Sequence, residues 1–318
     1  MILISEETHS DLYYDVEKCI DYCKQISEKE QNEIIDYHML WLVTSLPFSR
    51  KQALPVKSYL TTQNLKTTRL NVWSNVDLSE NEYLKPLIEK FPDNIKIRKW
   101  DPVEEAKGTP LEDKNYLTLN DSRCYISGDL FRILCLHNHG GLYVDVDVVF
   151  LRDFSSLLDQ EFMYKWSFQE NMINGAVMRL FRKSLLSQQL LETMVELGAL
   201  PDSLNWSSTL YEKVYEKNKN WTIFPSGFFN TEWQIKLSDQ EKADPTNRDL
   251  LNFIRYPFKK NPLSHEMYDG AFCWHWHNGW TTEIENGSKW ELLESKANFK
   301  LVQAHGDKIV YQDIHLRY

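Results

Sequence analysis

The sequence predicts an α/β fold in which helices flank a central sheet. Strand-like and helix-like patterns alternate between residues 37 and 100, as in parallel βαβ units. In the middle of the chain, a helical pattern over residues 125–139 stops at Gly140-Gly141, and a strand-like run over 142–151 follows. Hydrophobic residues make up 42% of the 318 positions, which is enough for a packed core.

The first third of the chain supplies most of the alternation. Residues 8–36 are expected to form one or two polar helices with one apolar stripe. Strands are predicted at 37–43, 70–73 and 95–100, helices at 51–61 and 79–91, and a loop at 101–122. Neither G-x-G-x-x-G nor G-x₄-G-K-[ST] occurs, so a dinucleotide fingerprint and a P-loop are both excluded.

The pattern after residue 160 is less regular. Apolar runs at 161–168 and 172–178 and an apolar segment at 221–229 indicate strands, the last one followed by a tight loop at Pro225 and Gly227. Helices are expected at 183–197, at 203–217 and near 288–296, while residues 236–266 remain unassigned.

Two carboxylates interrupt the strand-like run that follows Gly140-Gly141. Asp145 and Asp147 are two residues apart, so a regular strand would direct both side chains to the same face. Two like charges among apolar neighbours are costly to desolvate unless a cation compensates them. A D-x-D pair alone is common in solvated turns, but here it follows a helix, a glycine stop and an apolar strand. We therefore expect a site for Mn²⁺ or Mg²⁺ at the end of the strand.

A second informative segment, residues 271–280, alternates His275 and His277 with two tryptophans. A strand would place both imidazoles on one face. Taken alone, H-x-H suggests a zinc site.

Composition excludes several classes of partner. The net charge is −10 and no block of Lys or Arg stands out, which argues against nucleic acid or an anionic membrane as the main partner. The five cysteines are scattered and odd in number, as expected for reduced thiols. There is no apolar run long enough to span a bilayer and no signal-peptide pattern, so we expect a cytoplasmic enzyme of bacterial or viral type.

The central stretch resembles a known family. Residues 127–147 read S-x-D-L-x-R-x₇-G-G-L-Y-x-D-x-D, which is similar to the DXD-containing sugar-binding region of retaining nucleotide-sugar glycosyltransferases. Fungal α-1,6-mannosyltransferases, lactosylceramide α-galactosyltransferases and bacterial capsular polysaccharide transferases form this group, and the clostridial toxin glucosyltransferases share a similar core. The resemblance implies the Rossmann-like A-type (GT-A) glycosyltransferase fold, with a mixed central sheet flanked by helices. It also implies 37–318 as a single catalytic domain and 1–36 as a helical segment packed on it.

The resemblance also suggests roles for individual residues. It implies a metal bound by Asp145, Asp147 and His275, with Asp145, Asp147 and Asn174 as the catalytic set. The residues expected to bind the donor are Trp41, Asp129, Arg132, Gly141, Tyr143, Trp276 and Trp280. Structural readings remain open beside these: a buried core role for Trp41, an Asp129–Arg132 salt bridge, and a turn position for Asn174 before a glycine.

The expected activity is metal-dependent transfer of a hexosyl or pentosyl group from a nucleotide-diphosphate sugar, UDP in preference to GDP. The acceptor would be a hydroxyl of a glycan, a glycolipid or a protein, and the resemblance implies retention of anomeric configuration. One alternative is an aspartyl-phosphate-forming phosphatase with Asp145 as nucleophile and Asp147 as acid/base, although that motif usually follows the first strand. Another is a nucleotide-sugar-binding module without catalysis.

Overall fold

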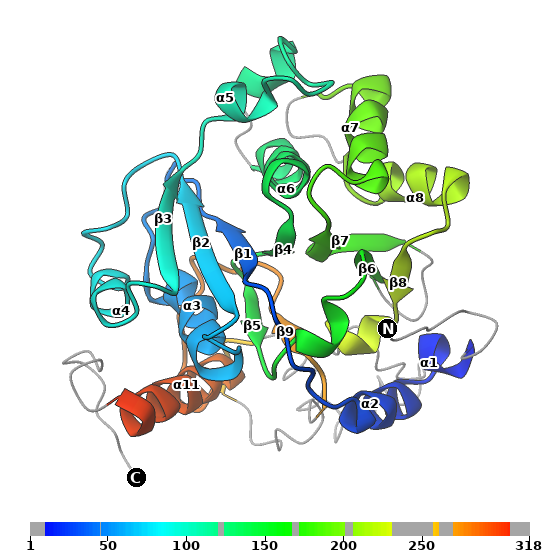
Figure 1. Ribbon diagram of the computed structural model, residues 1–318. Helices are drawn as coiled ribbons and strands as arrows, with labels where there is room; N and C mark the ends of the chain where they lie inside the picture. Colours follow the sequence, from blue (N-terminus) through cyan, green and yellow to red (C-terminus); the bar gives the residue numbers. More distant parts are fainter. Residues whose placement is uncertain are drawn as a thin grey trace.

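The computed structural model describes residues 10–44, 46–119, 124–166, 172–200, 206–230, 257–260 and 270–305 (Figure 1). A seven-stranded sheet forms the centre of the fold, and a separate two-stranded sheet lies beside it. The order of the large sheet is β3 (Ile95–Lys99), β2 (Thr68–Ser74), β1 (Ile35–Leu40), β4 (Gly141–Val144), β7 (Ile173–Leu180), β6 (Phe162–Lys165), β8 (Thr222–Phe224). The small sheet pairs β5 (Val148–Phe150) with β9 (Cys273–His275).

The large sheet is mixed. Strands β3, β2, β1 and β4 run parallel, whereas β7 is antiparallel to both β4 and β6. The parallel part comes from the alternating segment of the sequence, so the predicted α/β fold with a mixed central sheet is confirmed. Strand β1 ends at Leu40, and Trp41 therefore follows the strand at its carboxyl end.

Both faces of the large sheet are covered, because successive residues of its strands enter different hydrophobic clusters. On β4, Leu142 and Val144 belong to one cluster and Tyr143 to the other. Helices α3 (Arg50–Thr62) and α4 (Lys85–Lys90) contribute to the first cluster. The second cluster is built from α5 (Pro102–Ala106), α6 (Tyr125–His139), α7 (Leu185–Leu197) and α8 (Ser208–Lys217). Figure 1 shows these two groups of helices on opposite sides of the sheet.

The two ends of the described chain also pack on the core. At the start, α1 (Ser10–Tyr14) and α2 (Val16–Gln25) bring Cys19 and Cys23 into the first cluster. Arg152 caps the end of α2, since its guanidinium donates to the carbonyls of Cys23 and Ile26. At the other end, α11 (Lys289–His305) packs on α3. All five cysteines are free thiols.

Three local predictions need correction. The run 142–151 is not one strand, because β4 ends at Val144 and β5 begins at Val148 in the other sheet. The helix expected from residue 79 begins only at Lys85 and has a proline in its first turn. The residues before it form turns, in which the carbonyl of Asn81 accepts the backbone N–H groups of Leu84 and Lys85. The segment 101–122 is not a plain loop: it contains α5 and the short helix η1 (Asn115–Thr118).

Other elements follow their patterns closely. Helix α6 ends at Gly140 as predicted, and the φ of +67° there favours glycine, although with a ψ of −170° the residue is extended rather than in the left-handed helical region. The remaining short helices are η2 (Ser155–Leu157) and η3 (Ser226–Phe228). Most of the unassigned segment 236–266 lies outside the described residues, apart from 257–260.

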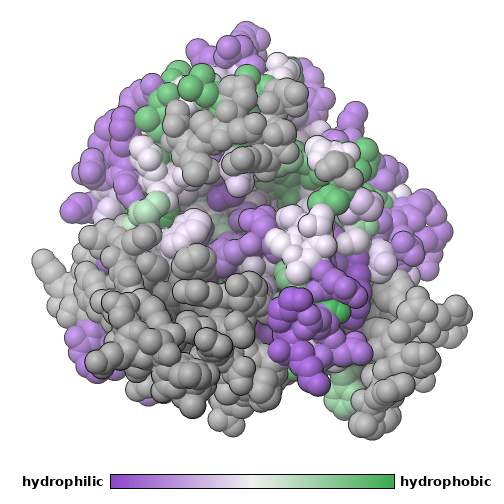
Figure 2. All heavy atoms as spheres, turned by 180° about the vertical axis from the view of Figure 1, so that it is seen from behind, coloured by the Kyte–Doolittle hydropathy of each residue, from purple (hydrophilic) through white to green (hydrophobic). Residues whose placement is uncertain are grey.

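Figure 2 shows the face opposite to that of Figure 1, where the described residues are mostly hydrophilic and the hydrophobic ones form small groups. This is expected for a face whose apolar side chains mostly lie inside, in the hydrophobic clusters. In the part of the chain that the structure describes, no helix is both long and apolar enough to cross a bilayer.

Candidate active site

The two aspartates lie in the turn that carries the chain from one sheet to the other. Asp145 still donates its backbone N–H to the carbonyl of Ala176 on β7, at 2.8 Å. The backbone N–H of Val148 then donates to the carbonyl of Asp145, at 3.1 Å, which closes a tight turn. The turn follows the carboxyl end of a parallel strand, where ligand sites of open α/β sheets are built.

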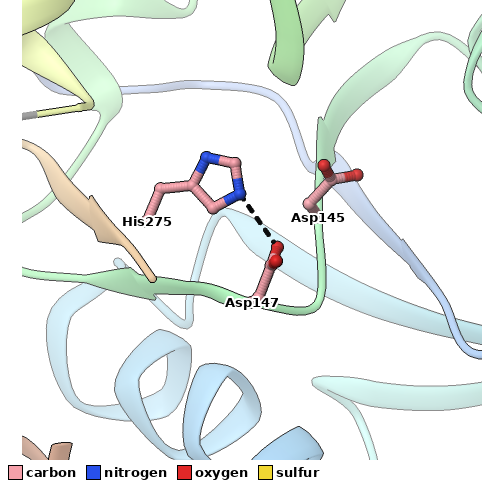
Figure 3. A group of neighbouring side chains, drawn as sticks. All are labelled: Asp145, Asp147 and His275. Atoms are coloured by element: carbon pink, nitrogen blue, oxygen red, sulfur yellow. Dashed lines mark ion pairs between the residues drawn. The ribbon is translucent and has the colours of Figure 1, made fainter. Parts of the chain in front are cut away.

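His275 reaches this turn from the other end of the sequence. It is paired with Val148 in the antiparallel β5–β9 ladder, which fixes its position beside Asp147. The imidazole Nε2 lies 3.1 Å from Asp147 Oδ1, and ligand atoms of His275, Asp145 and Asp147 all lie within 4.8 Å of one another (Figure 3). Among the described residues, this is the one cluster of three such side chains that could hold a metal.

The two carboxyl groups differ in their electrostatic environment. Burial raises the pKa of Asp147, but the adjacent His275 outweighs it and brings the pKa down to about 2. Burial raises the pKa of Asp145, and Arg132 opposes this effect without cancelling it. Asp147 is therefore the firmly ionised member of the pair, and Asp145 gains most from an added cation.

Tyr143 and Arg132 hold Asp145 in place. The Tyr143 hydroxyl donates a short hydrogen bond to Asp145 Oδ1, and Arg132 Nη2 lies 3.4 Å from the same oxygen. Arg132 Nη1 is also 3.6 Å from Asp129 Oδ1, so the salt bridge considered from the sequence does form. The buried Nε of Arg132 has no hydrogen-bond acceptor among the described residues, which leaves a donor for a bound anion.

Asn174 lies on β7 at the level of the acidic turn. It is inside the strand, so the alternative of a turn asparagine is wrong. Its Oδ1 accepts from the backbone N–H of Ala176 at 2.7 Å, while its buried Nδ2 has no acceptor within the described chain. Tyr164 faces it across the β6–β7 pair and brings its hydroxyl to 3.5 Å from His275 Nδ1. No sequence pattern singled out Tyr164.

Three tryptophans form an aromatic group next to the acidic turn. Trp41, at the end of β1, makes an edge contact with Trp280 at a centroid distance of 4.9 Å. Trp280 in turn lies 5.8 Å from Trp276, whose backbone N–H donates to the carbonyl of Asp147. Trp41 and Trp276 are buried with indole N–H groups that find no acceptor among the described residues. Trp41 is thus both a core residue and a wall of the site.

The second histidine does not continue the strand. His277 follows β9 with a φ of 54°, and its ring lies tilted against that of His275, with 3.8 Å between the ring centroids. Its Nε2 is 2.8 Å from Asn230 Oδ1. The next residue, Asn278, donates its backbone N–H to Asp147 Oδ2 at 2.7 Å. Sequence reasoning missed Asn278, although Asn-Gly after an apolar run is a signal for left-handed turns.

Gly141 lies at the amino end of β4, away from the aspartates at its carboxyl end. Its φ is +105°, and a Cβ at this position would come within 2.1 Å of the carbonyl oxygen of Asp36. The structure therefore explains this glycine by the close approach of β1 and β4.

The donor set fits a hard or borderline divalent cation. Two carboxylates and one imidazole can together ligate a divalent cation. The buried donors of Arg132, Asn174 and Trp276 lack acceptors in the described chain, as expected around a site for an anionic ligand that the metal would share.

The mixed α/β sheet places a D-x-D turn at the carboxyl end of a parallel strand. A known family matches this part of the chain. Residues 16–164 match the family described as "glycosyltransferase sugar-binding region containing DXD motif", so the family resemblance inferred from residues 127–147 is confirmed over this region.

Solved structures of glycosyltransferases are also similar to this chain. The PaToxG glycosyltransferase has 16% identity and a TM-score of 0.46, with 66% of this chain and 79% of that chain covered. Mouse xyloside xylosyltransferase 1 has 13% identity and a TM-score of 0.42, with coverages of 79% and 100%. The WbbM bifunctional glycosyltransferase has 10% identity and a TM-score of 0.44, with coverages of 85% and 53%. No curated protein sequence matches the chain.

Proposed function

We propose that this protein is a metal-dependent glycosyltransferase that moves a hexosyl or pentosyl group from a nucleotide-diphosphate sugar to a hydroxyl acceptor. The observation that carries the proposal is the convergence of Asp145, Asp147 and His275 at the carboxyl end of β4. The two aspartates lie inside the matched family region, and His275 lies outside it. We expect a UDP-sugar rather than a GDP-sugar as donor. The acceptor would be a glycan, a glycolipid or a protein.

In this proposal Asp145, Asp147 and His275 hold Mn²⁺ or Mg²⁺, which supplies a Lewis acid for the departing diphosphate. Arg132 adds a fixed positive charge, because Asp129 and Asp145 orient its guanidinium from two sides. Its free Nε–H and the indole N–H of Trp276 would donate to diphosphate oxygens.

The sugar and the base would be held by neighbouring groups. Asn174 offers its Nδ2–H₂ to a sugar hydroxyl, and the Asp129 carboxylate can accept from another. The flat rings of Trp41 and Trp280 provide an apolar wall for the nucleobase. Tyr143 and Gly141 act on the donor indirectly, Tyr143 by orienting Asp145 and Gly141 by setting the position of β4.

We propose retention by front-face attack. As the bond from the anomeric carbon to the diphosphate breaks, the acceptor oxygen bonds to the same face, and its proton passes to the leaving phosphate oxygen. The side chains then need only position the reactants and stabilise charge, so no nucleophilic residue is required. Residues 37–318 would act as one catalytic domain with 1–36 packed on it, and the cytoplasmic location stays a prediction.

The phosphatase alternative lacks support at the position of its nucleophile. Tyr143 and Arg132 contact one oxygen of Asp145, and burial raises the pKa of this carboxyl group, which favours its protonated form over the carboxylate needed as a nucleophile.

Titration calorimetry with nucleoside diphosphates, with and without Mn²⁺, tests the proposal. We expect UDP to bind with Mn²⁺ at least tenfold more tightly than without it, and Asp147→Ala to abolish this gain. Asp159→Ala serves as the matched control, because Asp159 forms an exposed ion pair with Lys29 away from the site. Absence of binding by every nucleoside diphosphate would refute the proposal, whereas binding without slow hydrolysis of any nucleotide-sugar would favour the non-catalytic module.

A further inference from the structure

The segment that follows His275 has a strained backbone. His277, Asn278 and Gly279 are consecutive and all have positive φ angles, of 54°, 71° and 81°. Only glycine adopts this region freely, so two of the three residues need outside contacts to stay there. We call residues 277–282 the Trp280 loop, since it places Trp280 against Trp41.

Side chains from distant parts of the fold hold this loop. Asp147 accepts from the backbone N–H of Asn278, at the acidic turn. On the opposite side, Lys51 Nζ donates to the carbonyl of Gly279 at 2.6 Å and also to the carbonyl of Thr282. These two carbonyls belong to one turn, because the N–H of Thr282 donates to the carbonyl of Gly279. The ammonium therefore closes a turn whose oxygens point in one direction.

Lys51 is an unusual residue for a merely structural contact. It is only 5% exposed, and among the described residues its ammonium forms no ion pair with a carboxylate. It lies 3.8 Å from the centroid of the Phe258 ring, and the same ring packs so closely on Gly279 that a Cβ there would come within 2.6 Å of it. Burial lowers the pKa of Lys51 to about 8, because the charged ammonium loses part of its hydration in the interior.

We propose that Lys51 is a positioning residue of the active site: it fixes the Trp280 loop so that Trp280 faces Trp41 and the Asn278 N–H reaches Asp147. This inference rests on the proposed function only for its effect on the donor. Lys51 is at the start of α3, and it contacts none of the three metal-site side chains in the described structure. Its influence on the donor would pass through the loop.

The test compares Lys51→Met, which keeps the length of the side chain but removes the ammonium, with Lys51→Arg, which restores a donor. Arg50→Met is the matched control, since Arg50 precedes Lys51 on the same helix but pairs with Glu294 instead of the loop. The first readout is amide hydrogen exchange of residues 277–282 without nucleotide. The second is calorimetric affinity for Mn²⁺ alone and for UDP with Mn²⁺.

We expect Lys51→Met to speed exchange in the loop about tenfold or more, with exchange in α6 and β4 unchanged. UDP affinity should fall about tenfold while affinity for Mn²⁺ alone changes less than about threefold, and Lys51→Arg should restore both. Loop exchange like that of the wild type in Lys51→Met, or an equal loss in Arg50→Met, would overturn the inference. If the wild type binds no UDP, the proposed function fails, whereas the exchange result still decides whether Lys51 anchors the loop.

Discussion

At the scale of single residues, the site depends on how Asp145 is oriented. Tyr143 is buried, and its hydroxyl donates directly to the Asp145 carboxylate. Groups that orient a metal ligand typically change metal affinity 10- to 100-fold when they are removed. The sequence motif includes Tyr143, but only the structure shows that its hydroxyl donates to Asp145, which lies in the turn after β4.

Tyr143→Phe should therefore reduce Mn²⁺ affinity by about tenfold and destabilise the fold by about 1 kcal/mol. Manganese titration calorimetry and urea unfolding measure the two effects. Tyr59→Phe is the control, because the Tyr59 hydroxyl makes a buried hydrogen bond to Thr68 away from the site. The role assigned to Tyr143 is wrong if both variants bind Mn²⁺ like the wild type.

At the scale of elements, a buried histidine connects β1, β2 and the start of β4. The indole N–H of Trp73 on β2 donates to His38 Nδ1, so Nε2 carries the proton and donates to the carbonyl of Gly140 at 3.0 Å. Both nitrogens are thus used by the neutral ring. Burial lowers the pKa of His38 to about 4, because the charged ring would lose its hydration in the interior. A proton on Nδ1 would also remove the acceptor of the Trp73 indole N–H.

Between pH 6.5 and 4 the unfolded chain binds a proton at this histidine and the folded chain does not, so stability falls as the pH decreases. The shift corresponds to about 3 kcal/mol by pH 4. The amide of Gln in His38→Gln can accept from Trp73 and donate to Gly140, but it does not titrate. We expect the free energy of unfolding of this variant to fall by about 3 kcal/mol less than that of the wild type over the same pH range. Urea unfolding at several pH values measures the difference, and parallel pH curves for the two proteins would rule out His38 as its source.

At the scale of the whole molecule, a buried ion pair connects the C-terminal helix to the N-terminal half. Lys57 on α3 and Glu294 on α11 are 3.0 Å apart, and both side chains are only 2% exposed. Arg50 contacts the same carboxylate from a more exposed position. Removing one member of such a pair leaves an uncompensated charge in the interior, whereas replacing both can be nearly neutral.

Glu294→Ala should therefore cost about 3–5 kcal/mol in the free energy of unfolding. The double variant Lys57→Met with Glu294→Leu should cost clearly less, because no buried charge remains unpaired. Urea unfolding of Lys57→Met, Glu294→Leu and the double variant gives the coupling free energy. Additive losses would mean that the pair does not connect α3 and α11 energetically.

The sequence by itself determined the local features: the α/β alternation, the helix that ends at Gly140, and the D-x-D pair within the apolar run that follows it. These follow from periodicity, glycine conformation and a motif within about thirty residues. The tertiary structure alone decided that β4 and β5 belong to different sheets and that the β5–β9 pairing is what brings His275 to Asp147. It also decided that Lys51 holds the Trp280 loop. Such contacts depend on packing between elements far apart in the chain, and no local pattern encodes which distant strand will pair.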